Sequence, residues 1–333
     1  MIVIPDPYLI FLGDVASPMD AKTGAGLVQW RGDRCLGQWR LPGCTVDLGI
    51  PEMNAAEARR AGARSLVIGV APFGGALAPG WVDAIVAALE AGLAIASGMH
   101  TRLSSVAKIA AAAQRNQGQL FDVRYADRAF DVGTGRKRSG RRLLTVGTDC
   151  CVGKKYAALA IAEELVRRGR RATFRATGQT GILISGEGIA IDHVVADFIA
   201  GAAEALSPDN TPDHWDVIEG QGSLFHPAYA GVSLGLLHGS QPDAIVVCHD
   251  PVRKHLDGYP GFPVPALRRC IEANLQAAQL TNPAARCVGV ALNTSHLGES
   301  AREQLLHQYA ADLGIPCFDP IATGAASVVS ALT

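Results

Sequence analysis

The stretch GTDCCVGKK, residues 147–155, follows the apolar run Leu143–Val146 and precedes an alanine-rich segment with helical periodicity. A strand, a glycine-bounded loop ending in lysine, and a helix form the pattern of a phosphate-binding loop. The glycines let backbone N–H groups approach phosphate oxygens, and the helix N-terminus adds the positive end of its dipole. We therefore predict that the loop binds a cofactor that carries phosphate. The predicted cofactor-binding residues are Gly147, Thr148, Asp149, Cys150, Cys151, Val152, Gly153, Lys154 and Lys155.

One residue of this loop departs from the usual pattern. Serine or threonine normally follows the loop lysine and holds a magnesium ion, whereas this chain has Lys155. A cationic side chain cannot coordinate a metal ion, but two lysines can neutralise a diphosphate or a 3′-phosphate that is held and not cleaved. Coenzyme A carries both groups. The loop therefore favours CoA over ATP and predicts no metal site, although an outward-turned Lys155 would leave magnesium to Glu219.

The composition indicates a well-mixed α/β protein with small-molecule partners. The 333 residues are 48% hydrophobic, and 30 Lys and Arg against 31 Asp and Glu leave a net charge of -1. This balance disfavours nucleic acid and acidic membranes as partners. No run reaches the roughly 18 apolar residues of a membrane helix, so we expect a cytoplasmic protein. The eight cysteines include no C-x-x-C pair, which indicates reduced thiols.

The order of apolar runs predicts two domains with parallel sheets. Residues 65–100 read as strand, glycine loop, helix and strand, which is a βαβ unit. From Arg141 onward, strands and helices alternate as in a doubly wound sheet of the P-loop NTPase class. We interpret the basic run Arg136–Arg142 as a solvated linker, with contact to phosphate as the alternative. The predicted domains are 1–135 and 141–333.

Polar residues follow several of these strands, at the sheet edge where open α/β folds bind ligands. Thr177 and Gln179 belong to one such loop, which we place across the phosphate site from Glu219. The segment WDVIEGQGSLFHP contains Glu219, Gln221, Ser223 and His226. Further candidates are Arg253, whose guanidinium can bind a carboxylate or phosphate, Asn293, which suits a purine edge, and the loop residues Lys22 and His100.

Several motifs resemble the bacterial family that contains the D-glutamate N-acetyltransferase. They are AKTG, ASGMH, GTDCCVGKK, ATGQTGI, IEGQGSLFHPAYAGVSLGLLHG and PDAIVVCHDPVR, and they extend over nearly the whole chain. The resemblance implies a Rossmann-like N-terminal domain, a P-loop C-terminal domain and acetyl transfer from acetyl-CoA to an acidic D-amino acid. The second domain is also similar to dethiobiotin synthetases, and the alternative is therefore an ATP-dependent kinase or ligase that uses magnesium.

An acetyl transfer to an amine needs a base and an oxyanion site. We predict that Glu219 or His226 is the general base, with His100 behind them. Backbone N–H groups of Gly220–Gly222 are candidates to stabilise the oxyanion. The predicted substrate contacts are Lys22, Gln221, Ser223 and Arg253. We also expect a homo-oligomer.

Overall fold

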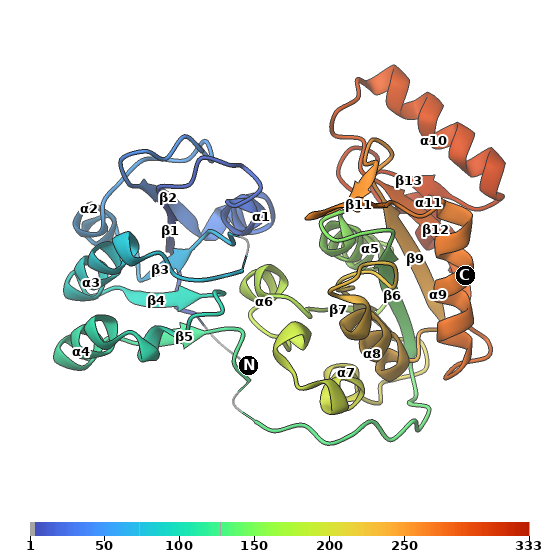
Figure 1. The fold of residues 1–333 in the computed structure, drawn as a ribbon, viewed down its shortest axis with the longest axis horizontal. Helices are drawn as coiled ribbons and strands as arrows, with labels where there is room; N and C mark the ends of the chain where they lie inside the picture. Colours follow the sequence, from blue (N-terminus) through green and yellow to red (C-terminus); the bar gives the residue numbers. More distant parts are fainter. Residues whose placement is uncertain (1–3, 73, 127, 333) are drawn as a thin grey trace. The chain divides into compact units, whose positions relative to one another are not determined.

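The computed structural model describes residues 4–72, 74–126 and 128–332 (Figure 1). Contacts divide the chain into two compact units. The first contains Met1–Asp127 and Gln179–Ala190, and the second contains Arg128–Gly178 and Ile191–Thr333. Among the described residues, none of the helices has the length and the apolar composition of a membrane span.

The first unit is built on a five-stranded parallel sheet in the order β2-β1-β3-β4-β5. Its elements are β1 (Tyr8–Gly13), α1 (Lys22–Arg31), β2 (Cys35–Arg40), α2 (Ala55–Arg60), β3 (Ser65–Ile68), α3 (Val82–Glu90), β4 (Ala94–Ser97), α4 (Ala107–Asn116) and β5 (Leu120–Asp122). The predicted βαβ unit is confirmed, because β3 and β4 pair in parallel with α3 between them. The strand order reverses between β1 and β3, which is where such sheets bind ligands.

The helix α6 (Gln179–Ser185) belongs to this first unit although it follows a strand of the second. Thr180 Oγ1 lies 3.0 Å from Thr23 Oγ1, and the Ile184 carbonyl accepts a hydrogen bond from Arg31 Nε at 2.9 Å. The contiguous division into 1–135 and 141–333 stays a prediction, to which the structure adds that residues 179–190 pack with the first unit.

The second unit has a six-stranded parallel sheet in the order β13-β12-β9-β6-β8-β7. Its elements are β6 (Arg141–Gly147), α5 (Lys154–Arg167), β7 (Ala172–Arg175), α7 (Ile199–Leu206), β8 (Trp215–Ile218), α8 (Ala230–Ser240), β9 (Ala244–His249), α9 (Leu267–Gln279), β12 (Arg286–Leu292), α10 (Glu299–Leu313), β13 (Cys317–Phe318) and α11 (Ala326–Ser330). A small antiparallel hairpin, β10 (His255–Leu256) and β11 (Tyr259–Pro263), lies between β9 and α9.

This arrangement confirms the predicted doubly wound sheet. The strand β6 pairs in parallel with β8 on one side and β9 on the other, so the loop that follows it lies near the middle of the sheet edge. The helix α5 packs with α11, whereas α8 packs with α7 and α9. Two groups of helices thus cover a sheet whose strands are apolar on both faces, for example AIVVCH of β9.

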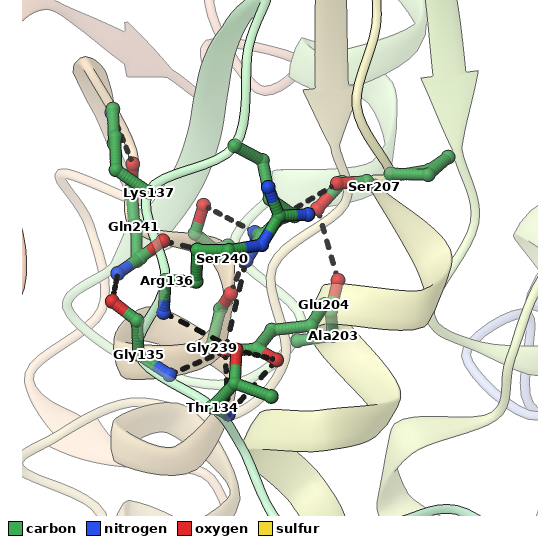
Figure 2. Close-up of polar contacts among 12 residues, drawn as sticks. Thr134, Gly135, Arg136, Lys137, Ala203, Glu204, Ser207, Gly239, Ser240 and Gln241 are labelled. Carbon is green, nitrogen blue, oxygen red and sulfur yellow. Dashed lines mark hydrogen bonds and ion pairs between the residues drawn. The ribbon is translucent and has the colours of Figure 1, made fainter.

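The basic run before β6 is not a solvated linker along its whole length. Arg138 and Arg142 are 5% and 0% exposed. Arg138 donates from Nε to the Ser207 carbonyl at 2.8 Å and from Nη2 to the Gly239 carbonyl at 2.8 Å. Ser207 is the C-cap residue that follows α7, and Gly239 lies in the last turn of α8 (Figure 2).

The physical reason is that the last carbonyls of a helix have no intrahelical donor and lie at the negative end of its dipole. Arg142 supplies further donors, from Nη2 to the carbonyls of Ser139 at 3.0 Å and Pro208 at 3.1 Å. Burial, together with the charge of Arg142, lowers the pKa of Arg138 to about 10. The linker interpretation holds only for the exposed Arg136 and Lys137, which pair with Asp209 and Asp243.

Candidate functional site

The loop between β6 and α5 has the backbone of a phosphate-binding turn. Gly153 has a φ of +100° and Cys151 a φ of +54°, a left-handed region that favours glycine. A Cβ on Gly147 would lie 3.1 Å from the Cys248 carbonyl oxygen. Lys154 is buried, and its Nζ donates to the Asp149 carbonyl at 2.6 Å. The lysine therefore lies over the loop, in reach of an anion bound there.

Neighbouring elements hold Thr148 in place. Its backbone N–H donates to the Cys248 carbonyl at 3.0 Å, and its carbonyl accepts from Ser223 Oγ at 3.1 Å. Its hydroxyl lies 3.0 Å from Nδ1 of His249, the last residue of β9. Burial lowers the pKa of His249, which favours a neutral ring. The shape of the loop is thus fixed by protein groups.

A buried ion pair holds Asp149. One carboxylate oxygen accepts from Arg253 Nη1 at 2.7 Å and from the Asp257 N–H at 2.8 Å, and the other accepts from the Cys150 N–H at 2.7 Å. Asp149 is 0% exposed. Arg253 also donates to the Cys150 carbonyl at 2.8 Å. A substrate carboxylate at Arg253 would have to share the guanidinium with this pair.

Glu219 follows β8 and is 4% exposed. Its Oε2 accepts backbone hydrogen bonds from Thr177 at 3.0 Å and Gly178 at 3.2 Å. Burial raises the pKa of the Glu219 carboxyl to about 7, against the opposing effects of the two amides and of the Lys155 charge. A carboxyl that titrates near neutral pH can accept a proton and release it again, as a general base requires.

His226 lies in a different environment. It is 1% exposed, its Nδ1 accepts the Ala228 N–H at 3.2 Å, and its Nε2 therefore donates to the Asp257 carbonyl, 3.1 Å away. Both ring nitrogens thus have protein partners, and the single in-plane lone pair, on Nδ1, accepts the Ala228 N–H and is not directed to a substrate amine. The ring connects the loop after β8 to the hairpin between β9 and α9.

Asp149, Cys150 and His226 place their potential ligand atoms within 4.8 Å of one another. A metal ion at this cluster would have to displace the hydrogen bonds that already hold the aspartate and the histidine. Burial raises the pKa of the Cys150 thiol to about 12, so the thiolate that a metal or an acyl group needs is strongly disfavoured. The surroundings of Cys150 fit the role of a small structural residue in a tight loop.

The other predicted site residues divide between the two units. In the second unit, Gln221 Nε2 donates to Thr177 Oγ1 at 3.0 Å, and Gln221 and Ser223 line a small cavity with Gly147. Asn293 Nδ2 donates to Asp250 Oδ2 at 3.2 Å.

In the first unit, Lys22 begins α1 and His100 is exposed after β4. Gln179 is in this unit too, where its amide donates to the Gly98 carbonyl and accepts from Arg124 Nη2 at 3.3 Å. Thr177 and Gln179, which we predict to share one cofactor site, therefore belong to different units.

Three residues that hold predicted site residues in place were not among the candidates from the sequence. His249, Asp250 and Asp257 contact Thr148, Asn293 and Asp149. His249 and Asp250 directly follow the apolar run of β9, so the strand-end rule that selected Glu219 could have selected them. Asp257 acts through its backbone, which no side-chain pattern reveals.

A doubly wound parallel sheet whose central strand runs into this lysine loop defines the second unit as a P-loop domain. The chain belongs to the DUF1611 family. Residues 39–126 match its N-terminal Rossmann-like domain and residues 131–329 match its C-terminal P-loop domain, each described as a domain of unknown function.

Similar proteins extend over the full chain. A protein of Tritonibacter scottomollicae named D-glutamate N-acetyltransferase is 48% identical over 330 residues, which cover 99% of each chain. A protein of the same name from Pseudoalteromonas sp. is 46% identical over 329 residues, again 99% of each chain. The crystal structure of a DUF1611 family protein from Anabaena variabilis ATCC 29413 is 32% identical, with a TM-score of 0.90 over 98% of this chain and 99% of that one. These relatives confirm the resemblance drawn from the motifs.

Proposed function

We propose that this protein is an N-acetyltransferase that moves an acetyl group from acetyl-CoA to the amino group of a D-amino acid, D-glutamate being the expected substrate. The observation that carries the proposal is the full-length similarity, at 46–48% identity, to two proteins of that name. Identity of this extent includes both units, so it is not explained by a shared P-loop alone.

The P-loop is assigned to the phosphates of CoA. Lys154 lies over the loop, and Lys155 stands where a magnesium-binding hydroxyl occurs in P-loops that cleave nucleotides. Two cations suit a diphosphate that must be held and left intact. The groups that keep the loop in shape, among them the pair of Asp149 with Arg253, reduce the conformational cost of binding.

Glu219 is assigned as the general base. The substrate ammonium group must lose a proton before its nitrogen can attack the thioester carbonyl carbon, and the Glu219 carboxylate accepts that proton. The C–N bond then forms, the C–S bond breaks, and CoA leaves as a thiol after taking up a proton. A pKa near 7 supplies the ionised base at neutral pH. His226 is assigned a positioning role, because both of its ring nitrogens have protein partners.

Not every backbone N–H group of the loop Gly220–Gly222 is available to stabilise the oxyanion. The Gly220 N–H already donates to Thr145 Oγ1 at 2.9 Å. We therefore assign the oxyanion to the amides after Gly220 or to Lys154. Gln221, Ser223 and Arg253 remain the proposed substrate contacts, while Lys22, in the first unit, stays a prediction.

A thiol-release assay tests the proposal. The protein is incubated with acetyl-CoA and D-glutamate in the presence of a chelator, free thiol is followed, and N-acetylglutamate is identified by mass spectrometry. L-Glutamate is the matched control for the stereochemistry. Release of thiol without metal supports the acetyltransferase. ADP formation from ATP and magnesium, with no thiol release, would replace it with the kinase or ligase alternative.

A further inference from the structure

A chain of aromatic rings lies beside the P-loop, and its members other than His226 have no role in the reaction described above. The rings of His226 and Tyr229 stack with centroids 4.7 Å apart and planes inclined by 24°. Tyr259 meets His226 edge-on at 4.9 Å, and Phe262 meets Tyr259 edge-on at 6.0 Å. Tyr229 is 43% exposed and Phe262 is 50% exposed. We call Tyr229, Tyr259 and Phe262, with His226 between them, the aromatic platform.

The platform is fastened to the anion-binding loop by direct contacts within the second unit. Tyr259 and Phe262 belong to β11, and the hairpin turn before it places Asp257 on the loop. The Asp257 N–H donates to Asp149 Oδ2 at 2.8 Å, and its carbonyl lies 3.1 Å from His226 Nε2. Two peptide groups of one residue therefore join the P-loop, the platform and the hairpin.

We propose that the aromatic platform binds the adenine ring of the nucleotide whose phosphates the P-loop holds. The identification of that nucleotide as CoA rests on the proposed function. A ligand that fits both features must carry phosphate and a flat π-system. CoA has an adenine, whereas its pantetheine arm offers amides and methylenes that gain little from a ring face. Stacking of a base on an aromatic side chain contributes affinity without a specific hydrogen-bond pattern.

The placement of Asn293 supports this assignment. Asn293 is the side chain that the sequence suggests for a purine edge, but its Nδ2 donates to Asp250 and its Oδ1 accepts from the Ser295 N–H at 3.3 Å. A purine at Asn293 would have to compete with these partners. The platform presents half-exposed ring surface that a purine can cover without breaking a protein hydrogen bond.

Calorimetric titration with two fragments of CoA tests the proposal. Adenosine 3′,5′-bisphosphate contains the base and phosphates, and 4′-phosphopantetheine contains the arm and a phosphate. The variants are Phe262→Leu and Tyr259→Leu, which keep apolar bulk and remove a ring. Phe198→Leu is the matched control, because Phe198 is exposed in the same unit but is not part of the platform. Tyr259→Phe retains the ring and should restore binding.

We expect each leucine variant of the platform to bind adenosine 3′,5′-bisphosphate about tenfold more weakly, the effect of losing one stacked ring. Affinity for 4′-phosphopantetheine should stay unchanged. Unchanged affinity for the adenosine fragment, or an equal loss for both fragments, would overturn the proposal. Phe262 is half exposed, so Phe262→Leu decides the matter if Tyr259→Leu fails to fold.

The same titrations separate this inference from the proposed function. A wild-type protein that binds the adenosine fragment through the platform, but releases no thiol from acetyl-CoA with D-glutamate, would refute the acetyltransferase and keep the platform. ADP is titrated as a third ligand. Ring-dependent binding of ADP without binding of CoA would assign the platform to ATP and overturn the identification with CoA.

Discussion

Replacing Glu219 with glutamine tests the candidate base by rate and by stability. Glutamine keeps the side-chain length and an oxygen that can accept the N–H groups of Thr177 and Gly178, but it cannot take a proton. We expect the rate of acetyl transfer to fall by about 10²- to 10⁴-fold, the usual effect of losing a positioned base. In the wild-type protein the rate should fall about tenfold per pH unit below pH 7, as the carboxylate becomes protonated.

The stability effect has a definite sign and size. A carboxyl whose pKa is raised from 4.5 to about 7 binds its proton more tightly in the folded state, so the folded protein loses stability as pH rises between these values. Through this group, the free energy of unfolding of the wild-type protein should fall by about 3 kcal/mol over this range. Glutamine does not titrate, and the free energy of unfolding of the variant relative to wild type should therefore increase by about 3 kcal/mol from pH 4.5 to pH 8.

Urea unfolding at a series of pH values measures this difference, and thiol release measures the rate. Glu303→Gln on the exposed surface of α10 is the matched control and should change neither quantity. A difference in unfolding free energy that stays constant with pH would contradict the raised pKa of Glu219. A variant that transfers acetyl groups at the wild-type rate from pH 6 to pH 9 would exclude Glu219 as the base.

Three further substitutions test the loop and its supports. Lys155→Thr should weaken CoA binding in calorimetry, and unchanged affinity would reject a phosphate-binding role for Lys155. The same variant should move the acidic limb of the pH–rate profile to higher pH, because Lys155 lowers the pKa of Glu219. Arg253→Ala should lower the unfolding free energy by about 2–4 kcal/mol, since it leaves Asp149 buried and unpaired. Adding Asp149→Asn should recover part of that loss, and simple additivity in urea unfolding would argue against the pairing. Arg138→Met should lower the unfolding free energy by about 3–5 kcal/mol, because several helix-end carbonyls lose their donor. Arg136→Met in the same basic run should change the unfolding free energy little. Equal effects of the two substitutions in urea unfolding would contradict the capping role of Arg138.

The strand, loop and helix around Gly147–Lys155 could be predicted because each depends on local pattern. Apolar runs specify buried parallel strands, glycine specifies the turn, and the lysines specify an anion. The position of Glu219 followed from the same logic, since a polar residue after a buried strand reaches the ligand-binding edge of the sheet. Its raised pKa did not, because burial depends on residues that pack around it from other elements.

Three features of this protein were decided only by tertiary structure, since each depends on partners distant along the chain. Arg253 pairs with Asp149 across 104 positions, and a sequence pattern shows only an arginine beside a strand. Arg138 is buried because the ends of α7 and α8 offer it carbonyl acceptors; a run of basic residues alone favours solvent. The helix α6 packs with the first unit through Thr180 and Ile184, although its sequence neighbours belong to the second. The amino-acid sequence thus determined which elements form and which residues follow the strands, while long-range contacts determined which of those side chains remain available for chemistry.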